Sequence, residues 1–124
     1  LHQSFDDKKT IAFLFANDLA DLAQKPSWVD GSGLSRYNLF TPENFTSILH
    51  KMYTSYPFER LQNIFPTGGE LGGTLSGNYK NLNGKIFAKT GTLSGQVALS
   101  GYLITASAVR KAVEQFIQVL YNKN

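Results

Sequence analysis

The residue types best suited to chemistry are concentrated in residues 88–95, which read Ala-Lys-Thr-Gly-Thr-Leu-Ser-Gly. An ammonium at Lys89 beside the hydroxyls of Thr90 and Thr92 offers a carboxylate both charge and hydrogen-bond donors. Gly91 weakens a strand and is most useful where a ligand or another main chain comes close. At a sheet edge, the free N–H and C=O groups of this strand could also pair with an extended peptide. The alternative is a solvent-facing edge strand whose lysine discourages aggregation, and composition alone does not favour either interpretation.

Positive charge is unevenly distributed along the 124 residues, whose formal net charge is +3. Residues 1–66 carry six basic and seven acidic side chains, whereas residues 67–124 carry six basic and two acidic ones. The electropositive second half favours an anionic partner such as a carboxylate, a phosphate or a membrane surface. The basic residues are scattered singly, which argues against nucleic acid and leaves ordinary solvated lysines as the plain alternative.

The composition also excludes several kinds of site. The chain has no cysteine, so it has neither a disulfide framework nor a thiolate zinc site. Its two histidines, His2 and His50, do not form a ligand-like pair, and we therefore expect neither a metal nor another cofactor. No apolar run approaches the roughly 18 residues of a membrane span, while 42% hydrophobic residues are enough for a packed core.

The first half of the chain, residues 1–65, is predicted to be helical. Apolar residues recur at helical spacing over residues 6–23, and acidic side chains suit the start of that helix. Thr41 is a typical N-cap and Pro42 a typical first helical residue, so a second helix is expected to begin there. Pro57 is expected to open a short third helix.

The second half is predicted to contain a hairpin over residues 85–105 and a terminal helix. Its strands are expected over residues 85–92 and 96–105, with Gly95 in a three-residue turn where a left-handed residue is needed. The second strand is apolar on both faces and should therefore lie inside a sheet. The apolar stripe of residues 108–122 predicts an amphipathic helix packed on that sheet, with a membrane-surface helix as the alternative.

These elements make an α+β fold with an incomplete sheet. Only two strands are predicted, and an isolated hairpin is marginally stable in water. We therefore expect the remaining strands of an antiparallel sheet to come from other polypeptide. The first residue is Leu1 rather than Met, so either a processed chain or a piece of a larger one is expected.

Several ordered blocks between residues 26 and 105 resemble the serine D-alanyl-D-alanine carboxypeptidases and endopeptidases of the low-molecular-mass, class C penicillin-binding group. Residues 30–36, with Asn38, resemble the family's Asp-Gly-Ser-Gly-Leu-Ser-Arg block. Residues 73–75 resemble its Gly-Thr-Leu. Residues 85–102 resemble the strand pair that carries Lys-Thr-Gly, then Thr-Leu-Ser-Gly, then a Gly-Tyr strand.

The resemblance implies a penicillin-recognising transpeptidase or β-lactamase-like fold, a five-stranded antiparallel sheet with flanking helices, of which residues 1–124 would be the C-terminal portion. It implies a serine enzyme that is acylated by peptidoglycan stem peptides, releases terminal D-alanine and is sensitive to β-lactams. Lys89, Thr90 and Gly91 match the family's Lys-Thr-Gly motif and would be catalytic, holding the substrate carboxylate and the network around the nucleophile. The main-chain N–H of Thr92 would bind substrate as one oxyanion-hole donor.

The family's nucleophile motif, Ser-x-x-Lys, is absent from this chain, since none of its ten serines is followed by lysine three positions later. Ser-x-Asn occurs at residues 76–78, eleven residues before Lys89. We interpret it as a loop coincidence, because the family's motif lies upstream of the Asp-Gly-Ser-Gly block. Gly72 stands where the family often carries Asp, so no acidic role is expected there.

The junction after the hairpin also departs from the family. Relatives usually run through a further strand before the terminal helix, but residues 105–108 leave no room for a strand and a turn. We therefore expect residues to be missing between Ser107 and Ala108.

Ser32 is a separate candidate for a nucleophile within this chain. A nucleophile elbow needs Gly-x-Ser-x-Gly, whereas positions 30 and 34 are Asp and Leu. We therefore interpret residues 30–35 as a structural turn that shapes a cleft wall.

The leading hypothesis is that residues 1–124 form the C-terminal part of a periplasmic D-alanyl-D-alanine carboxypeptidase or endopeptidase, a hydrolase of the cell wall. Peptidoglycan stem peptides and β-lactam antibiotics are the expected partners, and the isolated chain is expected to be inactive because its nucleophile lies elsewhere. The alternative is a non-catalytic module that binds a peptidoglycan peptide or a protein strand at the hairpin edge. No nucleic acid or transmembrane segment is expected, and a homo-oligomer or strand exchange is left open.

Overall fold

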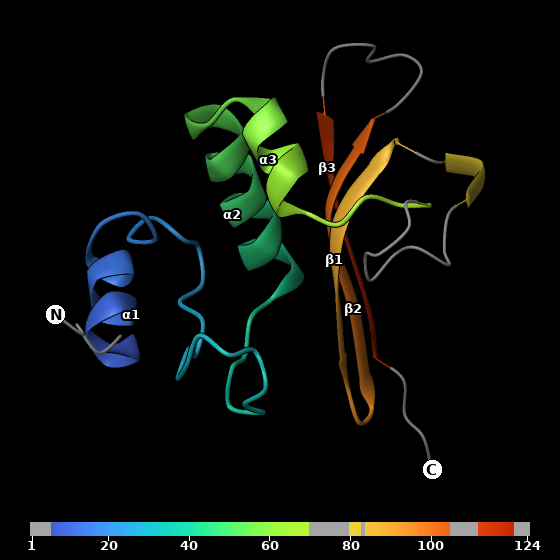
Figure 1. The fold of residues 1–124 in the computed structure, drawn as a ribbon. Helices are drawn as coiled ribbons and strands as arrows, with labels where there is room; N and C mark the ends of the chain where they lie inside the picture. The colour runs from blue at the N-terminus through green and yellow to red at the C-terminus, as the bar shows by residue number, and fades with distance from the viewer. Residues whose placement is uncertain (1–5, 70–79, 83, 105–111, 121–124) are drawn as a thin grey trace, which may run out of the picture. The chain divides into compact units, whose positions relative to one another are not determined.

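The structure, a computed structural model, describes residues 6–69, 80–82, 84–104 and 112–120. The elements follow in the order α1 (Asp7–Ala16), α2 (Pro42–Ser55), α3 (Phe58–Ile64), the 3-10 turn η1 (Lys80–Leu82), β1 (Ile86–Leu93), β2 (Gln96–Ile104) and β3 (Ala112–Leu120) (Figure 1). The chain divides into two compact units, Leu1–Asn44 and Phe45–Asn124.

The first unit begins with α1, which is shorter than predicted. Asp6 caps the helix by accepting a hydrogen bond from the Lys9 N–H at 3.2 Å. The helix ends before Asn17, whose side-chain amide donates to the Phe13 carbonyl at 2.8 Å. Such a local side-chain bond competes with helix continuation, and the helix predicted over residues 6–23 therefore stops early.

The loop after α1 is closed by a bridge and an aromatic cluster. Ser27 and Leu39 form an isolated antiparallel bridge that joins the two ends of the loop. Trp28 lies edge-on to Phe15 and Phe40, with ring centroids 6.3 Å and 5.8 Å apart. Edge-to-face packing of this kind stabilises beyond the apolar area that it buries.

The predicted start of α2 is confirmed by reciprocal capping. The Asn44 N–H donates to the Thr41 hydroxyl at 3.0 Å, and the Thr41 N–H donates to the Asn44 side-chain oxygen at 2.9 Å. This is a capping box with asparagine in the third position. The Asn44 side-chain amide also donates to the Gln24 carbonyl at 2.6 Å, so a polar residue that is only 2% exposed has partners for both ends of its side chain.

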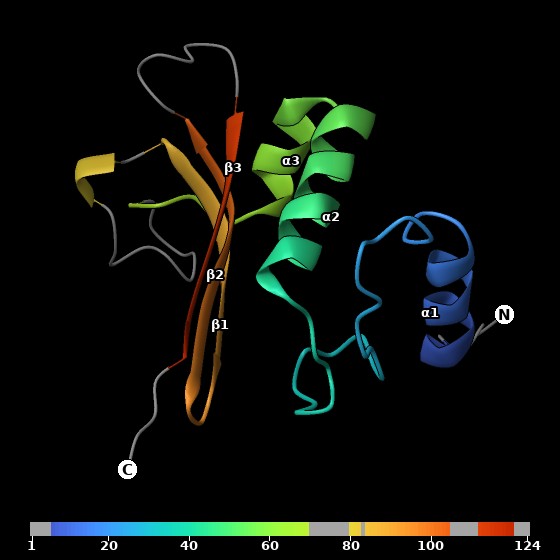
Figure 2. The same ribbon diagram turned by 180° about the vertical axis from the view of Figure 1, so that it is seen from behind.

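In the second unit, the three strands form an antiparallel sheet in the order β1-β2-β3, and α2 and α3 cover one face (Figure 2). The predicted hairpin and the interior position of its second strand are confirmed. Leu93 pairs with Gln96, which leaves a two-residue turn of Ser94 and Gly95, one residue shorter than predicted. Gly95 has the expected left-handed conformation, with φ at +82°.

The helix predicted over residues 108–122 is wrong, because β3 occupies most of this segment. β3 pairs antiparallel with β2 along its whole length, from Ile104 opposite Ala112 to Gln96 opposite Leu120. We expect residues to be missing between Ser107 and Ala108 only if no further strand follows the hairpin. β3 is such a strand, so this reason no longer applies. The junction itself lies outside the described residues.

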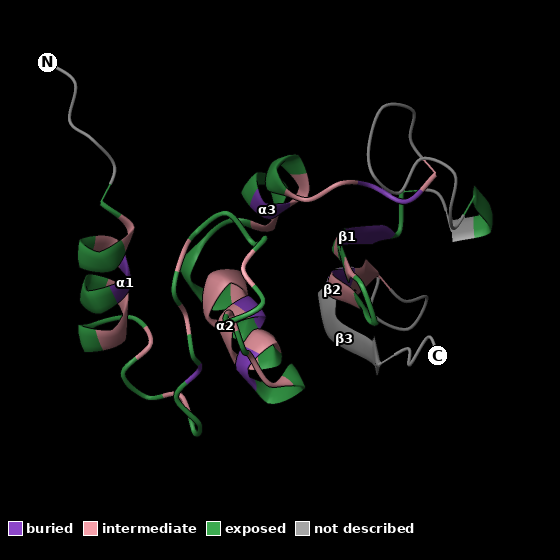
Figure 3. Cartoon of the chain, turned by 90° about the horizontal axis from the view of Figure 1, so that it is seen from below, coloured by how far each residue is buried: buried purple, intermediate pink, exposed green. Residues whose placement is uncertain are grey.

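The main core lies between α2, α3 and the sheet (Figure 3). Tyr102 is 1% exposed, and its hydroxyl donates to the Leu49 carbonyl of α2 at 2.8 Å. Leu61 of α3 is fully buried in the same cluster. Partly buried apolar side chains complete the packing: Met52, Tyr53, Phe58 and Phe65. β2 is therefore fixed to the helices by both packing and a buried hydrogen bond.

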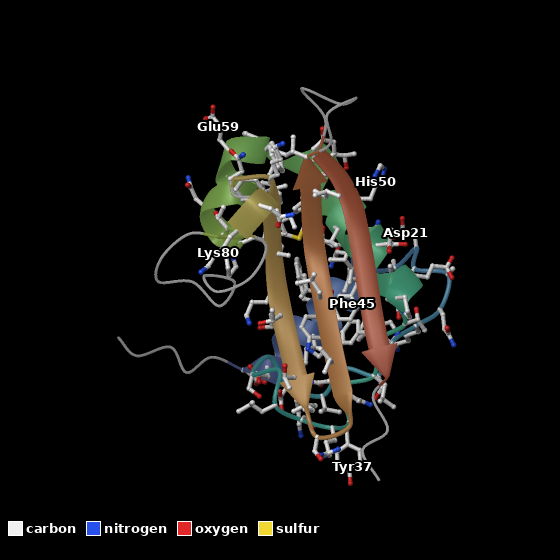
Figure 4. All side chains as sticks on the ribbon, turned by 90° about the vertical axis from the view of Figure 1, so that its right-hand side faces the viewer. Asp21, Tyr37, Phe45, His50, Glu59 and Lys80 are labelled. Carbon is white, nitrogen blue, oxygen red and sulfur yellow. The ribbon has the colours of Figure 1, made fainter. Side chains whose placement is uncertain are left out.

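The opposite face of the sheet carries a second cluster and a close approach of two strands. Ile86 and Ala88 are buried there with Leu99 and Leu103 packed against them. Figure 4 shows the sheet in front of the helices. Gly101 lies across from Ala88, and a Cβ at this glycine would collide with the Phe87 carbonyl oxygen and with Ala88 itself. Only glycine fits at this crossing.

Candidate active site

β1 changes character at its midpoint. Its first three residues, 86–88, are buried, whereas Lys89, Gly91 and Thr92 are exposed and Thr90 is half-buried. All four predicted site residues therefore lie on one strand, in the half that the core leaves uncovered.

The outer edge of β1 is covered along its buried half. The Gly68 N–H donates to the Ile86 carbonyl at 2.8 Å, and the Ala88 N–H donates to the Pro66 carbonyl at 2.9 Å. Thr67 forms an isolated bridge with this half of the strand. The cover stops at Ala88, and no other described segment pairs with the edge beyond it.

The main-chain groups of Thr90 and Thr92 point toward the uncovered part of this edge. The Ile104 N–H donates to the Lys85 carbonyl at 2.8 Å, so Lys85 and every second residue after it face β2. The even-numbered residues of β1 consequently face outward. Within the described part of the chain, the Thr92 N–H has no hydrogen-bond partner, and an extended peptide can pair with it.

Lys89 brings positive charge to the same edge. Its ammonium donates a hydrogen bond to the outward-facing carbonyl of Thr90 at 2.8 Å. Across the part of the molecule that the structure describes, no carboxylate pairs with Lys89. The open half of β1 thus combines a cation with a free main-chain donor, which suits a peptide that carries a carboxylate.

The two strand glycines differ in what the fold demands of them. A Cβ at Gly101 would collide with β1, whereas a Cβ at Gly91 would meet only the Ala98 Cβ at 3.7 Å, an ordinary contact. The fold therefore explains Gly101 but not Gly91. A glycine without a reason in the packing, on an exposed edge, is consistent with close approach of a ligand.

Two neighbours of the candidate site escape prediction from the sequence. Ser100 lies directly across from Lys89 on β2. The sequence does not predict this pair, because the predicted three-residue turn shifts the pairing of the two strands by one residue. Thr67 and its neighbours cover the first half of the edge. No local pattern in the sequence signals this cover, because it joins segments about 20 residues apart.

The interpretation of residues 30–35 as a structural turn is confirmed. The Ser32 hydroxyl donates to an Asp30 carboxylate oxygen at 2.8 Å and accepts from the Leu34 N–H at 3.1 Å. The Asn38 side-chain amide donates to the Asp30 carbonyl at 3.2 Å. The Ser32 hydroxyl above all holds the pKa of the Asp30 carboxyl below its usual value of 3.8, which makes this carboxylate a poor general base for a serine nucleophile.

Several predicted features fall outside the described residues. The Gly-Thr-Leu block at residues 73–75, Gly72 and the Ser-x-Asn at residues 76–78 all belong to that group. Among the described residues, no three His, Asp or Glu side chains are grouped as metal ligands. The helices of this described part are all too short or too polar to cross a membrane.

Comparison with known proteins identifies relatives of most of the chain. The D-Ala-D-Ala carboxypeptidase 3 (S13) family matches residues 22–122. The D-alanyl-D-alanine carboxypeptidase DacB of Haemophilus influenzae is 37% identical over 92 residues, which cover 71% of this chain and 19% of that protein. A D-alanyl-D-alanine carboxypeptidase of an Actinomadura species is 39% identical over 80 residues, covering 60% of this chain and 15% of that protein.

Solved structures extend the match to the fold. The crystal structure of penicillin binding protein 4 (dacB) from Haemophilus influenzae superposes with a TM-score of 0.70 at 30% identity. The superposition covers 93% of this chain and 26% of that one. The same protein complexed with a β-lactam superposes with a TM-score of 0.71 and covers 27% of that chain.

The chain therefore spans less than a fifth of the length of the curated relatives described above and about a quarter of the solved structures. The predicted family and the predicted fold, partial in this chain, are both confirmed. By the match over residues 22–122, this chain belongs to the D-Ala-D-Ala carboxypeptidase 3 (S13) family.

Proposed function

We propose that this chain is the Lys-Thr-Gly-bearing part of a serine-type D-alanyl-D-alanine carboxypeptidase or endopeptidase that hydrolyses peptidoglycan stem peptides through an acyl-enzyme. The observation that carries the proposal is the open half of β1, where Lys89 and the outward-facing groups of Thr90 and Thr92 lie on an edge that other described residues leave unpaired. Family membership supplies the reaction class. The Ser-x-x-Lys nucleophile is supplied from outside residues 1–124.

Each group on the open half of β1 has a role in this reaction. Lys89 and Thr90 hold the terminal carboxylate of the peptide, through charge and a hydroxyl donor. Gly91 lets the peptide approach the strand closely. The Thr92 N–H donates to the scissile carbonyl oxygen as negative charge develops on it, and one such donor typically contributes about 10²–10³ in rate. The serine oxygen attacks the scissile carbonyl carbon, the amide C–N bond breaks, and the terminal D-alanine leaves as an amine with the serine's proton. Water then hydrolyses the acyl-enzyme ester and frees the serine.

We extend the proposal to inhibitors and to location. A superposed relative was solved in complex with a β-lactam, and a carboxylate-bearing acylating agent fits the same cation and N–H donor. The enzyme is therefore proposed to be acylated by β-lactams. Because its substrate is the peptidoglycan of the cell wall, we place its activity in the periplasm.

The nucleophile's location is tested with a labelled penicillin. Incubated with the full-length enzyme, the label is expected to give one covalent adduct per molecule by mass spectrometry. Incubated with the 124-residue chain alone, it is expected to give none. A stoichiometric adduct on the 124-residue chain would overturn the external nucleophile, and failure of the full-length enzyme to react would overturn the enzymatic function.

The role of the Lys-Thr-Gly strand is tested in the same assay with matched lysine variants. Lys89→Ala in the full-length enzyme is expected to slow acylation by about 10²-fold or more, because the carboxylate loses its cation. Lys85→Ala removes the same charge from another exposed residue, just before β1, and is expected to leave the rate nearly unchanged. Equal effects of the two variants would show that only overall charge matters.

A second function, a non-catalytic module that binds peptides, is favoured by one observation. Its described residues leave the edge of β1 open beyond Ala88, and residues 1–124 contain no Ser-x-x-Lys. This function predicts that a D-Ala-D-Ala peptide binds the 124-residue chain without hydrolysis and that Lys89→Ala abolishes the binding. No binding at millimolar peptide would count against it.

A further inference from the structure

Lys89 and Ser100 lie side by side on the face of the sheet that α2 and α3 cover. Side chains alternate between the two faces of a strand, so Lys89 lies on the same face as Phe87. Ser100 likewise lies on the same face as Tyr102, which pairs with Phe87. The Phe58 ring of α3 meets both of these aromatic rings edge-on, with centroid separations of 5.8 Å, and this contact identifies the face.

The helix cover ends between these two neighbouring pairs of residues. Phe87 and Tyr102 are 6% and 1% exposed, whereas Lys89 is exposed and Ser100 is half-buried. The register makes Lys89 and Ser100 a hydrogen-bonded pair, and the Cβ atoms of such a pair are about 5 Å apart. The four-carbon stem of lysine is long enough to bring the ammonium to the Ser100 hydroxyl.

The packing gives no reason for a hydroxyl at Ser100. Among the described residues, this hydroxyl has no hydrogen-bond partner. Its place on an inner strand, between Ala98 and Tyr102 on the same face, suits an apolar or β-branched side chain at least as well as serine. The Ser100 hydroxyl is therefore available as an acceptor.

The present partner of Lys89 lies on the other side of its strand. The ammonium donates to the outward-facing Thr90 carbonyl at 2.8 Å, away from Ser100 on β2. Neighbouring strands lie about 4.8 Å apart, so an ammonium in this position stands where a peptide must lie to pair with the edge. Pairing at Thr90 therefore moves the ammonium, and a charged donor that loses its acceptor is costly unless it finds another.

We propose that Ser100 is a positioning residue for Lys89: when a peptide pairs with the open half of β1, the ammonium turns over the sheet face and donates to the Ser100 hydroxyl. The cation then stays beside the edge, next to the peptide's carboxylate, without blocking the strand. The inference rests on the proposed function, because it assumes that a peptide binds along this edge. Ser100 acts through Lys89 and does not itself touch the substrate.

A double-mutant cycle in the full-length enzyme tests this role, with kcat/KM for release of D-alanine from a D-Ala-D-Ala peptide as the measurement. Ser100→Ala is expected to lower kcat/KM about tenfold, because one hydrogen bond to a charged group is lost. Ser100→Thr keeps a hydroxyl and suits a strand, so it is expected to stay within about threefold of the unaltered enzyme. In enzyme that already carries Lys89→Ala, Ser100→Ala is expected to change kcat/KM by less than about twofold.

The comparison of the two backgrounds separates positioning from packing. Equal losses with and without Lys89, or a loss for Ser100→Thr as large as that for Ser100→Ala, would assign Ser100 to packing and overturn the proposal. No loss for Ser100→Ala in the unaltered enzyme would overturn it as well. Urea denaturation of each variant is expected to give an unchanged midpoint. An unaltered enzyme that releases no D-alanine would overturn the proposed function itself, a result distinct from the other three.

Discussion

Two short polar segments of this chain are similar in composition and opposite in structure. Residues 30–33 read Asp-Gly-Ser-Gly and residues 89–92 read Lys-Thr-Gly-Thr, each with one charge, hydroxyls and glycine. In the first segment, the charged group and the hydroxyl bind one another and the neighbouring main chain. In the second, the hydrogen-bonding groups face an edge that is unpaired among the described residues.

The difference lies in what orders each segment. Residues 30–33 are ordered by their own hydrogen bonds, whereas residues 89–92 are ordered by the packing of the rest of their strand. Gly101 brings β2 against the first half of β1, and Tyr102 fixes β2 to α2. A segment whose position is fixed by the packing of neighbouring residues does not use its own polar groups for that purpose. These groups stay free to bind a substrate and are held in fixed positions, as preorganised binding requires.

The largest expected effect on stability comes from Gly101, where β2 lies close against β1 just before residues 89–92. Gly101→Ala places a Cβ where the Phe87 carbonyl and Ala88 already lie, so the strands must separate. We expect a loss of about 3 kcal/mol or more in the free energy of unfolding, as for a severely overpacked core. Urea denaturation followed by circular dichroism measures it.

Gly91→Ala is the matched control, since it adds the same methyl group to the same pair of strands. The new Cβ meets only the Ala98 Cβ at 3.7 Å, and the unfolding free energy is expected to change by less than about 1 kcal/mol. Its effect should appear instead in acylation of the full-length enzyme, which is expected to slow. Similar destabilisation by both variants would contradict the distinction between the two glycines.

The next effect concerns the segment ordered by its own hydrogen bonds. Asn38→Ala removes an acceptor for the Val29 and Asp30 N–H groups, at 2.8 Å and 3.3 Å, and a donor to the Asp30 carbonyl. We expect a loss of about 1–2 kcal/mol, because each such bond contributes about 1 kcal/mol net. Trp28, the single tryptophan, donates to the same Asp30 carbonyl at 2.7 Å, so its fluorescence follows the unfolding of this loop. An unchanged transition would show that the loop is held by packing instead.

Removing the charge of the second segment is expected to change stability least among the substitutions. Lys89 is exposed, and among the described residues its ammonium bonds only to the carbonyl of its neighbour Thr90. Lys89→Ala should therefore alter the unfolding free energy of the 124-residue chain by less than about 0.5 kcal/mol, although it is expected to slow acylation in the full-length enzyme. A large loss of stability would mean that Lys89 belongs to the fold rather than to the site.

Local signals in the sequence were sufficient for some parts of this fold. Thr41 and Pro42 predict the start of α2, because a cap and a proline act within one helical turn. Gly95 similarly predicts the hairpin turn between β1 and β2. In each case, the signal and the structure that it predicts lie within a few residues.

Features that depend on distant pairing could not be predicted in this way. The apolar spacing of residues 108–122 fits a helix as well as a strand, and pairing with β2 decides in favour of β3. The cover of β1 by Pro66 and Gly68 has the same origin, since it joins segments about 20 residues apart. The sequence therefore predicts which residues of β1 form the candidate site, but not how much of its edge is open.

The smallest expected effect is a pH dependence in the first segment. Folding lowers the pKa of Asp30, chiefly through the Ser32 hydroxyl. The ionised carboxylate therefore stabilises the loop at pH values above the unfolded pKa, near 3.8. This stabilisation is lost as the pH falls through the lower, folded value. The protection of the Ser32 N–H against amide exchange, taken relative to its intrinsic exchange rate at each pH, should accordingly persist at neutral pH and decrease as the pH falls through the lowered pKa.

Ser32→Ala isolates the cause of that pKa shift. Without the hydroxyl, the pKa of Asp30 is expected to rise toward its usual value, which an NMR titration of the carboxyl carbon measures directly. An unchanged pKa in this variant would mean that the main-chain donors alone order the turn. A raised pKa with no change in the rate of acylation would show that the hydroxyl of residues 30–33 serves its own loop. The hydroxyls of Thr90 and Thr92 would then differ in function from the Ser32 hydroxyl, as they already differ in hydrogen bonding.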